Sequence, residues 1–155
     1  MSVALLTETQ ITGFKQNGFI IVPQMVEKEV GDRLKEIANE HLSELIAPVE
    51  YELDVHYPGA PADEMGLGAR TSRRLLQVFA RDEGYRRWAT SNDVKVVLEQ
   101  LFGDSEIALS QCHHNCIMTK EPNFSSVTLW HQDIRYWSFD QQNLVSVWLA
   151  LGTEN

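Results

Sequence analysis

The sequence has few cysteines, which limits the ways in which it can be cross-linked. Only two of the 155 residues are cysteine, Cys112 and Cys116. Residues four apart in an extended segment have Cα atoms about 13 Å apart, whereas a disulfide tolerates about 7 Å. If this segment is a strand, a disulfide scaffold is excluded.

Basic residues are also scarce. Thirteen Lys and Arg stand against 22 Asp and Glu, which gives a formal net charge of −9. A chain with this charge would repel a phosphate backbone instead of releasing its counterions. We therefore expect no nucleic-acid partner.

Long apolar runs are missing as well. No segment approaches the roughly 18–20 uninterrupted apolar residues that a membrane span needs, and MSVALLTETQ lacks the basic start and apolar stretch of a signal peptide. We expect a cytoplasmic protein with no membrane contact. With 43% apolar residues, the chain suits a single soluble domain over residues 1–155.

The first third of the chain contains clear helix signals. Thr7 and Gln10 form a capping-box pattern, which predicts a helix over Glu8–Asn17 that ends at Gly18. The apolar run FIIVP at 19–23 then predicts a strand.

Two further helices follow. Apolar residues recur at spacings of three and four over 27–46, which predicts an amphipathic helix in which His41 is a packed core residue. Asn92 is a candidate N-cap for a helix over 93–102, and Gly103 suits its C-terminal end.

Residues 48–70 contain three prolines and three glycines without a sustained period, which predicts a long loop. Such loops are often lids or contact substrate, and His56 lies inside this one. The next stretch is locally basic, and we expect most of its arginines to be surface partners of carboxylates, although one could bind an anion. These arginines are Arg70, Arg73, Arg74, Arg81, Arg86 and Arg87.

After residue 103 the pattern changes from helical to extended. Segments 106–119, 126–134 and 143–151 are rich in Val, Ile, Leu, Thr and Trp and are separated by turn-like sequences. We expect an α+β fold, with a helical part over about 1–103 and strands from about 104 onward. A jelly-roll or cupin-type barrel would protect the edges of such a sheet.

One of these segments carries a candidate metal motif. LWHQDIRYW at 129–137 places His131 and Asp133 two positions apart. In a strand, such residues project from the same face with Cα atoms roughly 6–7 Å apart, so an imidazole and a carboxylate can share one ion. The pair is short enough to arise by chance, so the motif alone does not identify a metal site.

A second metal reading involves Cys112, His113, His114 and Cys116. Tetrahedral zinc needs all its ligands within about 2.3 Å of one point. In a strand His113 faces away from the others and the two cysteines cannot meet, whereas in a helix the cysteines share a face. The zinc site stays open for a helical segment, and the alternative is that the two cysteines are small buried hydrophobic residues beside histidines of a sheet.

Three stretches together resemble a known family. GFIIVPQMV, WHQDIRYW and NLVSVWLALGTEN, between about Gly18 and the last residue, are similar to the phytanoyl-CoA dioxygenase family of iron(II)- and 2-oxoglutarate-dependent oxygenases. The resemblance implies a double-stranded β-helix with N-terminal helices and a His-x-Asp…His iron triad. His131 and Asp133 map onto its first two ligands. Such a triad leaves three adjacent positions for 2-oxoglutarate and oxygen.

The resemblance also implies an activity and further site residues. The expected reaction is hydroxylation of a small organic or acyl substrate, coupled to conversion of 2-oxoglutarate to succinate and carbon dioxide. The strand before the motif lines the cosubstrate pocket in the family, a second strand packs an aromatic residue against it, and aromatics after the motif lie near the substrate. The corresponding residues are Asn115, Ile117 and Thr119, then Trp148, then Tyr136 and Trp137.

The family pattern continues beyond LGTEN with a strand that supplies the distal histidine and with an arginine that binds 2-oxoglutarate, whereas this sequence ends at Asn155. We therefore expect a C-terminally incomplete barrel that belongs to a longer protein. The alternatives are completion by a partner chain, a truncated inactive relative, or replacement of the ligand by His56 or His114. Unpaired sheet edges would favour association between copies of the chain.

A second function remains open beside the oxygenase. The chain would then be a catalytically inactive binding or assembly module that keeps the jelly-roll fold without iron or 2-oxoglutarate. The two hypotheses differ in whether the whole polypeptide takes up metal and turns over 2-oxoglutarate.

Overall fold

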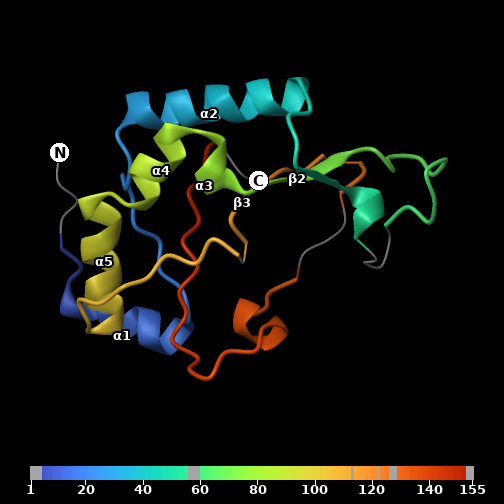
Figure 1. Ribbon diagram of the computed structural model, residues 1–155. Coiled ribbons are helices and arrows are strands. Elements are labelled where there is room, and N and C mark those ends of the chain that lie inside the picture. Colours follow the sequence, from blue (N-terminus) through green and yellow to red (C-terminus); the bar gives the residue numbers. More distant parts are fainter. Residues whose placement is uncertain (1–4, 56–59, 113, 122, 126–128, 153–155) are drawn as a thin grey trace. The chain divides into compact units, whose positions relative to one another are not determined.

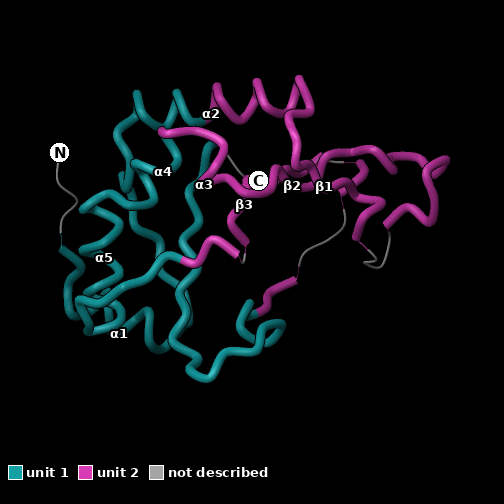
Figure 2. Tube along the Cα trace, in the orientation of Figure 1, with its two compact units in different colours: residues 1–34, 84–109, 132–155 teal, residues 35–83, 110–131 magenta. Residues whose placement is uncertain are grey.

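The computed structural model describes residues 5–55, 60–112, 114–121, 123–125 and 129–152 (Figure 1). It divides into two compact units, which are described separately below (Figure 2). Unit 1 comprises Met1–Leu34, Gly84–Leu109 and Gln132–Asn155, and unit 2 comprises Lys35–Glu83 and Ser110–His131.

Helix α1 of unit 1 spans Glu8–Asn17, as predicted. The Thr7 hydroxyl accepts a hydrogen bond from the Gln10 backbone N–H, and the Gln10 side chain accepts one from the Thr7 N–H at 2.9 Å. Gly18 ends the helix in a left-handed conformation with φ of 79°. Because these signals lie within the segment itself, they act without tertiary context.

Helix α5 spans Asn92–Phe102 and contributes the buried residues Val94, Val97 and Leu101 to the core of unit 1. Its N-cap is Ser91, whose hydroxyl accepts from the Val94 N–H, so the prediction of Asn92 as the cap was wrong by one position. Leu6, Val97 and Leu101 form the buried cluster. The apolar residues packed against it are Ile11, Phe14, Ile20, Val22, Met25 and Val145.

Helix α2 spans Lys28–Ser43, slightly shorter than predicted, and buries Leu34, Ile37 and Ala38. Helix α4, over Glu83–Ala89, was not predicted, and its buried Tyr85 donates from its hydroxyl to the Leu34 carbonyl at 2.7 Å. The amphipathic period therefore identified α2 correctly, whereas the short α4 carries no comparable pattern.

Several predicted strands are not formed. Segments 19–23 and 143–151 are rich in residues that favour strands, but they do not pair as strands. At the end of the predicted strand 126–134, Asp133–Tyr136 form a short 3-10 helix, η2. Ile20, Val22 and Val145 pack against the α5 core instead. A strand needs a hydrogen-bonded neighbour, and β propensity measures only how well side chains fit such a surface.

Unit 2 contains a three-stranded antiparallel sheet in the order β1-β2-β3. Strands β1 (Val49–Tyr51), β2 (Ser72–Leu76) and β3 (Cys116–Met118) pair with Val49 and Ile117 both opposite Leu75. Residues 48–70 were predicted as loop, but they begin with β1 and a 3-10 helix, η1 (Glu52–Asp54). Among the described residues of the predicted strand 106–119, which leave out residue 113, only Cys116–Met118 form a strand.

The expected mixture of N-terminal helices and antiparallel strands is confirmed, but the described residues do not form a double-stranded β-helix. The outer strands β1 and β3 each pair only with β2 in the sheet that the structure describes. Association of copies through these edges remains a prediction. No helix within the described ranges has the length and apolar character needed to cross a membrane.

Candidate functional site

His131 carries the side-chain geometry of a potential metal ligand. Its Nδ1 lies 2.7 Å from the carbonyl oxygen of Leu129, and the residue is exposed. Since a carbonyl oxygen only accepts, the proton of the neutral ring lies on Nδ1 and the lone pair on Nε2. Histidines that bind metal usually make this kind of backbone hydrogen bond through the other ring nitrogen.

Asp133 is held by a neighbouring side chain, whereas His131 is held by a backbone carbonyl. It is the first residue of η2, is half-buried, and accepts a hydrogen bond at Oδ2 from the Ser146 hydroxyl at 2.7 Å. Carboxylates that bind metal are likewise oriented by hydrogen bonds from neighbouring groups. Ser146 has no signal in the sequence, because a serine inside an apolar run has no motif of its own.

The two residues belong to different units, since unit 2 ends at His131 and unit 1 resumes at Gln132. Within the part of the chain that the structure describes, no three His, Cys, Asp or Glu residues form a group able to hold a metal ion. His56 and His113 lie outside the described residues, and His114 is exposed. The environments of His131 and Asp133 individually fit the role of ligand, and their sharing of one ion stays a prediction.

The aromatic residues after the motif retain exposed ring surface. Tyr136 is 64% exposed and stacks with the Arg135 guanidinium, whose carbon lies 5.6 Å from the ring centre. Trp137 meets Phe139 edge to face at 6.2 Å. Trp148 is 67% exposed. These rings are available to cover a ligand, but their assignment to substrate or cosubstrate is untested.

The residues expected to line the cosubstrate pocket lie in and beside β3. Ile117 is opposite Leu75, and the Thr119 hydroxyl donates to the Ser72 carbonyl at 2.5 Å. The Asn115 side chain accepts from the Phe79 N–H at 2.9 Å at the start of helix α3, Val78–Arg81. Asn115 and Thr119 therefore support local structure, and their role at a cosubstrate stays a prediction.

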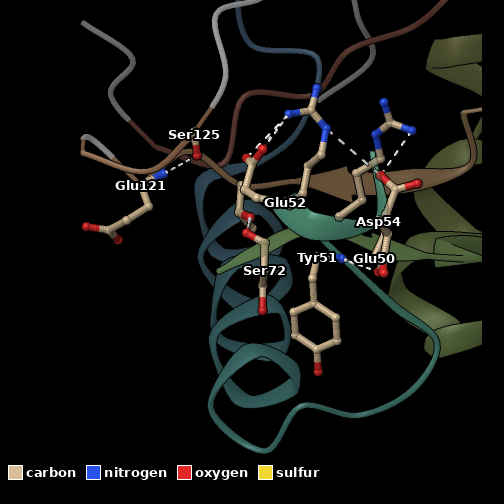
Figure 3. A network of polar contacts seen from close by, with 10 residues as sticks. Glu50, Tyr51, Glu52, Asp54, Ser72, Glu121 and Ser125 are labelled. Carbon is tan, nitrogen blue, oxygen red and sulfur yellow. Dashed lines mark hydrogen bonds and ion pairs between the residues drawn. The ribbon is translucent and has the colours of Figure 1, made fainter. Parts of the chain in front are cut away.

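A group of charged residues lies on the same sheet (Figure 3). Nη1 of the buried Arg73 lies 3.1 and 3.3 Å from the two carboxylate oxygens of Glu52, which is itself fully buried. Glu50 lies 3.2 Å from Nη1 of Arg74 and 3.9 Å from Nε of Arg73. The general expectation that the arginines of this stretch lie at the surface is therefore wrong for Arg73.

These charges also affect Lys120, which follows Thr119. Burial and the positive charges of Arg73 and Arg74 lower the pKa of the Lys120 amine below its usual 10.5, against the opposing influence of Glu52. The burial of Arg73 follows from the fold, because the positions along β2 alternate between half-buried and buried. In a period-two pattern, Arg73 occupies the buried face together with Leu75.

The zinc reading required a helix around Cys112 and Cys116. The described residues from 104 to 115 are not helical, Cys116 begins β3, and neither Cys112 nor Cys116 forms a disulfide. The condition that would place the two thiols on one face is therefore not met.

Comparison with known proteins identifies the family. A model of the phytanoyl-CoA dioxygenase (PhyH) family matches residues 14–155, which include both His131 and Asp133. The chain therefore belongs to this family. No curated protein and no solved structure matches it. Family membership indicates an oxygenase-type function, and enzymes of this family typically use Fe(II) and 2-oxoglutarate.

Proposed function

We propose that the protein is a non-haem iron(II)- and 2-oxoglutarate-dependent dioxygenase that hydroxylates a small organic or acyl substrate. The observation that carries the proposal is the family match over residues 14–155 with a His-x-Asp pair inside it. The proposal assigns His131 and Asp133 as two of the three protein ligands of iron. We also propose that the protein folds as a double-stranded β-helix, the fold in which this family brings its iron ligands together.

The local geometry of each ligand supports this assignment. The Leu129 carbonyl keeps the His131 proton on Nδ1, so the Nε2 lone pair can face a metal ion. The Ser146 hydroxyl fixes one oxygen of Asp133. One nitrogen and one carboxylate oxygen suit Fe(II), which is commonly bound by two histidines and one carboxylate in oxygenases that leave positions open for cosubstrates.

Iron, once bound, would supply the oxidation chemistry together with 2-oxoglutarate. The chain's own share is to hold the ligand atoms and to shield the reacting region from water. The exposed rings of Tyr136 and Trp148 supply apolar surface for such a cover. We propose that Trp148, with Asn115, Ile117 and Thr119, faces the cosubstrate, and that Tyr136 and Trp137 face the substrate.

The test uses the complete natural polypeptide with Fe(II), 2-oxoglutarate and oxygen. Succinate is measured, because it is the product of 2-oxoglutarate whatever the identity of the substrate. We expect succinate formation that His131→Ala and Asp133→Ala abolish. Asp140→Ala, which changes an exposed aspartate nearby in sequence, should retain it.

The alternative of a non-catalytic binding or assembly module predicts neither metal uptake nor succinate with the same polypeptide. That outcome would reject the dioxygenase. If His114→Ala abolishes turnover and His131→Ala does not, a dioxygenase with a different ligand set would replace the assignment proposed here.

A further inference from the structure

The hydrogen bond between Ser146 and Asp133 joins two segments of unit 1 that are 13 residues apart in sequence. The donor is the Ser146 hydroxyl, because an ionised carboxylate only accepts. The Oγ to Oδ2 distance of 2.7 Å is the usual length of a hydrogen bond from a hydroxyl donor. This contact is not part of the His-x-Asp motif.

We propose that Ser146 is a positioning residue that orients the Asp133 carboxylate toward the metal, an inference that rests on the proposed function. A carboxylate has two chemically equivalent oxygens and turns about its Cβ–Cγ bond. A hydrogen bond that occupies Oδ2 selects one rotation of the group. The other oxygen is then presented in one direction, as a metal with defined coordination geometry requires.

The backbone on both sides of the contact is anchored. Asp133 opens η2, whose turn is closed by hydrogen bonds from the Arg135 N–H to the Gln132 carbonyl and from the Trp137 N–H to the Ile134 carbonyl. Ser146 follows Val145, which packs against the core of Leu6, Val97 and Leu101.

Packing of Val145 therefore fixes the backbone that presents the Ser146 hydroxyl. A donor fixed in this way loses little side-chain freedom when it makes the bond, because serine has a single rotatable bond before its oxygen. The arrangement suits orientation of a ligand better than a long, mobile donor such as lysine would.

The experiment measures anaerobic Co(II) binding to the complete natural polypeptide, with Co(II) as a spectroscopic substitute for Fe(II). Loss of a group that orients a metal ligand typically weakens metal binding by about 10–100-fold. We expect Ser146→Ala to raise the Co(II) dissociation constant by about tenfold or more and to change the visible Co(II) absorption bands. Ser146→Thr, which keeps the hydroxyl, should restore both.

Ser138→Ala is the matched control, since it removes an exposed hydroxyl five residues beyond Asp133 in the same unit. Thermal unfolding without metal shows whether a variant is folded, and a purely structural role would lower this stability without a specific change in the Co(II) bands. Ser146→Thr provides a second measurement if Ser146→Ala is poorly folded, because its dissociation constant should match that of the wild type.

Two results would overturn the proposal in distinguishable ways. Wild-type Co(II) binding that Asp133→Ala abolishes but Ser146→Ala leaves unchanged refutes the role of Ser146 and preserves the metal centre. Absence of Co(II) binding by the wild type rejects the metal centre, and the role of Ser146 with it.

Discussion

Replacing Glu52 by glutamine removes the negative charge that faces the buried Arg73 guanidinium while keeping the shape of the side chain. The side chains of Glu52 and Arg73 are 0% and 5% exposed, and their closest atoms are 3.1 Å apart. Loss of one partner from a buried pair costs about 3–5 kcal/mol, because the other charge stays buried without compensation. Glu50, which lies 3.9 Å from Arg73 Nε, still compensates part of the Arg73 charge in this variant. We therefore expect the free energy of unfolding to fall by about 3 kcal/mol, the lower end of this range.

The measurement is urea unfolding followed by far-ultraviolet circular dichroism. With a slope of about 2 kcal/mol per molar urea, a loss of about 3 kcal/mol lowers the unfolding midpoint by about 1.5 M. Glu52→Met combined with Arg73→Met should remain within about 1 kcal/mol of the wild type, because removing both charges also removes the cost of burying them.

Asp32→Asn is the control, since it breaks the ion pair of Lys28 and Asp32, whose side chains are 81% and 58% exposed. Exposed pairs contribute about 0–1 kcal/mol, so this variant should unfold close to the wild-type midpoint. Equal midpoint shifts for Glu52→Gln and Asp32→Asn would refute the reasoning, because the penalty would then not depend on burial.

Two further predictions concern residues beside β3. Asn115→Ala should lower the free energy of unfolding by about 1 kcal/mol, because the Phe79 N–H loses its acceptor and the Gln111 carbonyl loses its donor. Asn115→Asp keeps the acceptor alone and should lie between Asn115→Ala and the wild type, and equal urea midpoints for the wild type and Asn115→Ala would contradict this. Lys120 has a lowered pKa when folded, so its charge destabilises the fold at neutral pH, and this cost disappears as pH rises above 10.5. Lys120→Gln should therefore be more stable at pH 7 by at most about 0.5 kcal/mol, given the exposure of the residue, with the difference vanishing above pH 10.5 in the same assay.

Local signals account for the correctly predicted elements. The bounds of α1 follow from Thr7, Gln10 and Gly18, which lie next to the helix that they delimit. The N-terminus of α5 was misplaced by one residue because Ser91 and Asn92 are both good capping residues, and the choice between them depends on backbone geometry.

The strands could not be predicted in the same way, because pairing depends on distant residues. SRRLL is basic and lacks a continuous apolar pattern, yet it is the central strand of the sheet. Arg73 is tolerated on the buried face because carboxylates from an earlier part of the chain reach it, Glu52, 21 residues earlier, at 3.1 Å and Glu50 at 3.9 Å. The opposite error occurred at 143–151, where extended composition suggested a strand but no pairing is formed within the described chain.

The sequence predicted the residues of the candidate metal site but not the groups that orient them. The motif and the family identified His131 and Asp133, whereas the hydrogen bonds from Ser146 and to Leu129 required coordinates. A hydroxyl that acts through a neighbouring carboxylate has no fixed spacing from it in sequence. The cytoplasmic location and the cosubstrate contacts of Asn115, Ile117, Thr119 and Trp148 remain predictions.

Two backbone hydrogen bonds close the base of the connection between η1 and β2, and the residues at its tip take no part in these bonds. The Glu52 N–H donates to the Thr71 carbonyl at 2.9 Å and the Leu53 N–H donates to the Ala69 carbonyl at 3.2 Å, while Met65 is 93% exposed. Each doubling of loop length costs only about 0.6 kcal/mol of closure entropy. Insertions beside Met65 should therefore be well tolerated, which makes this position suitable for a peptide tag or a fluorescent label.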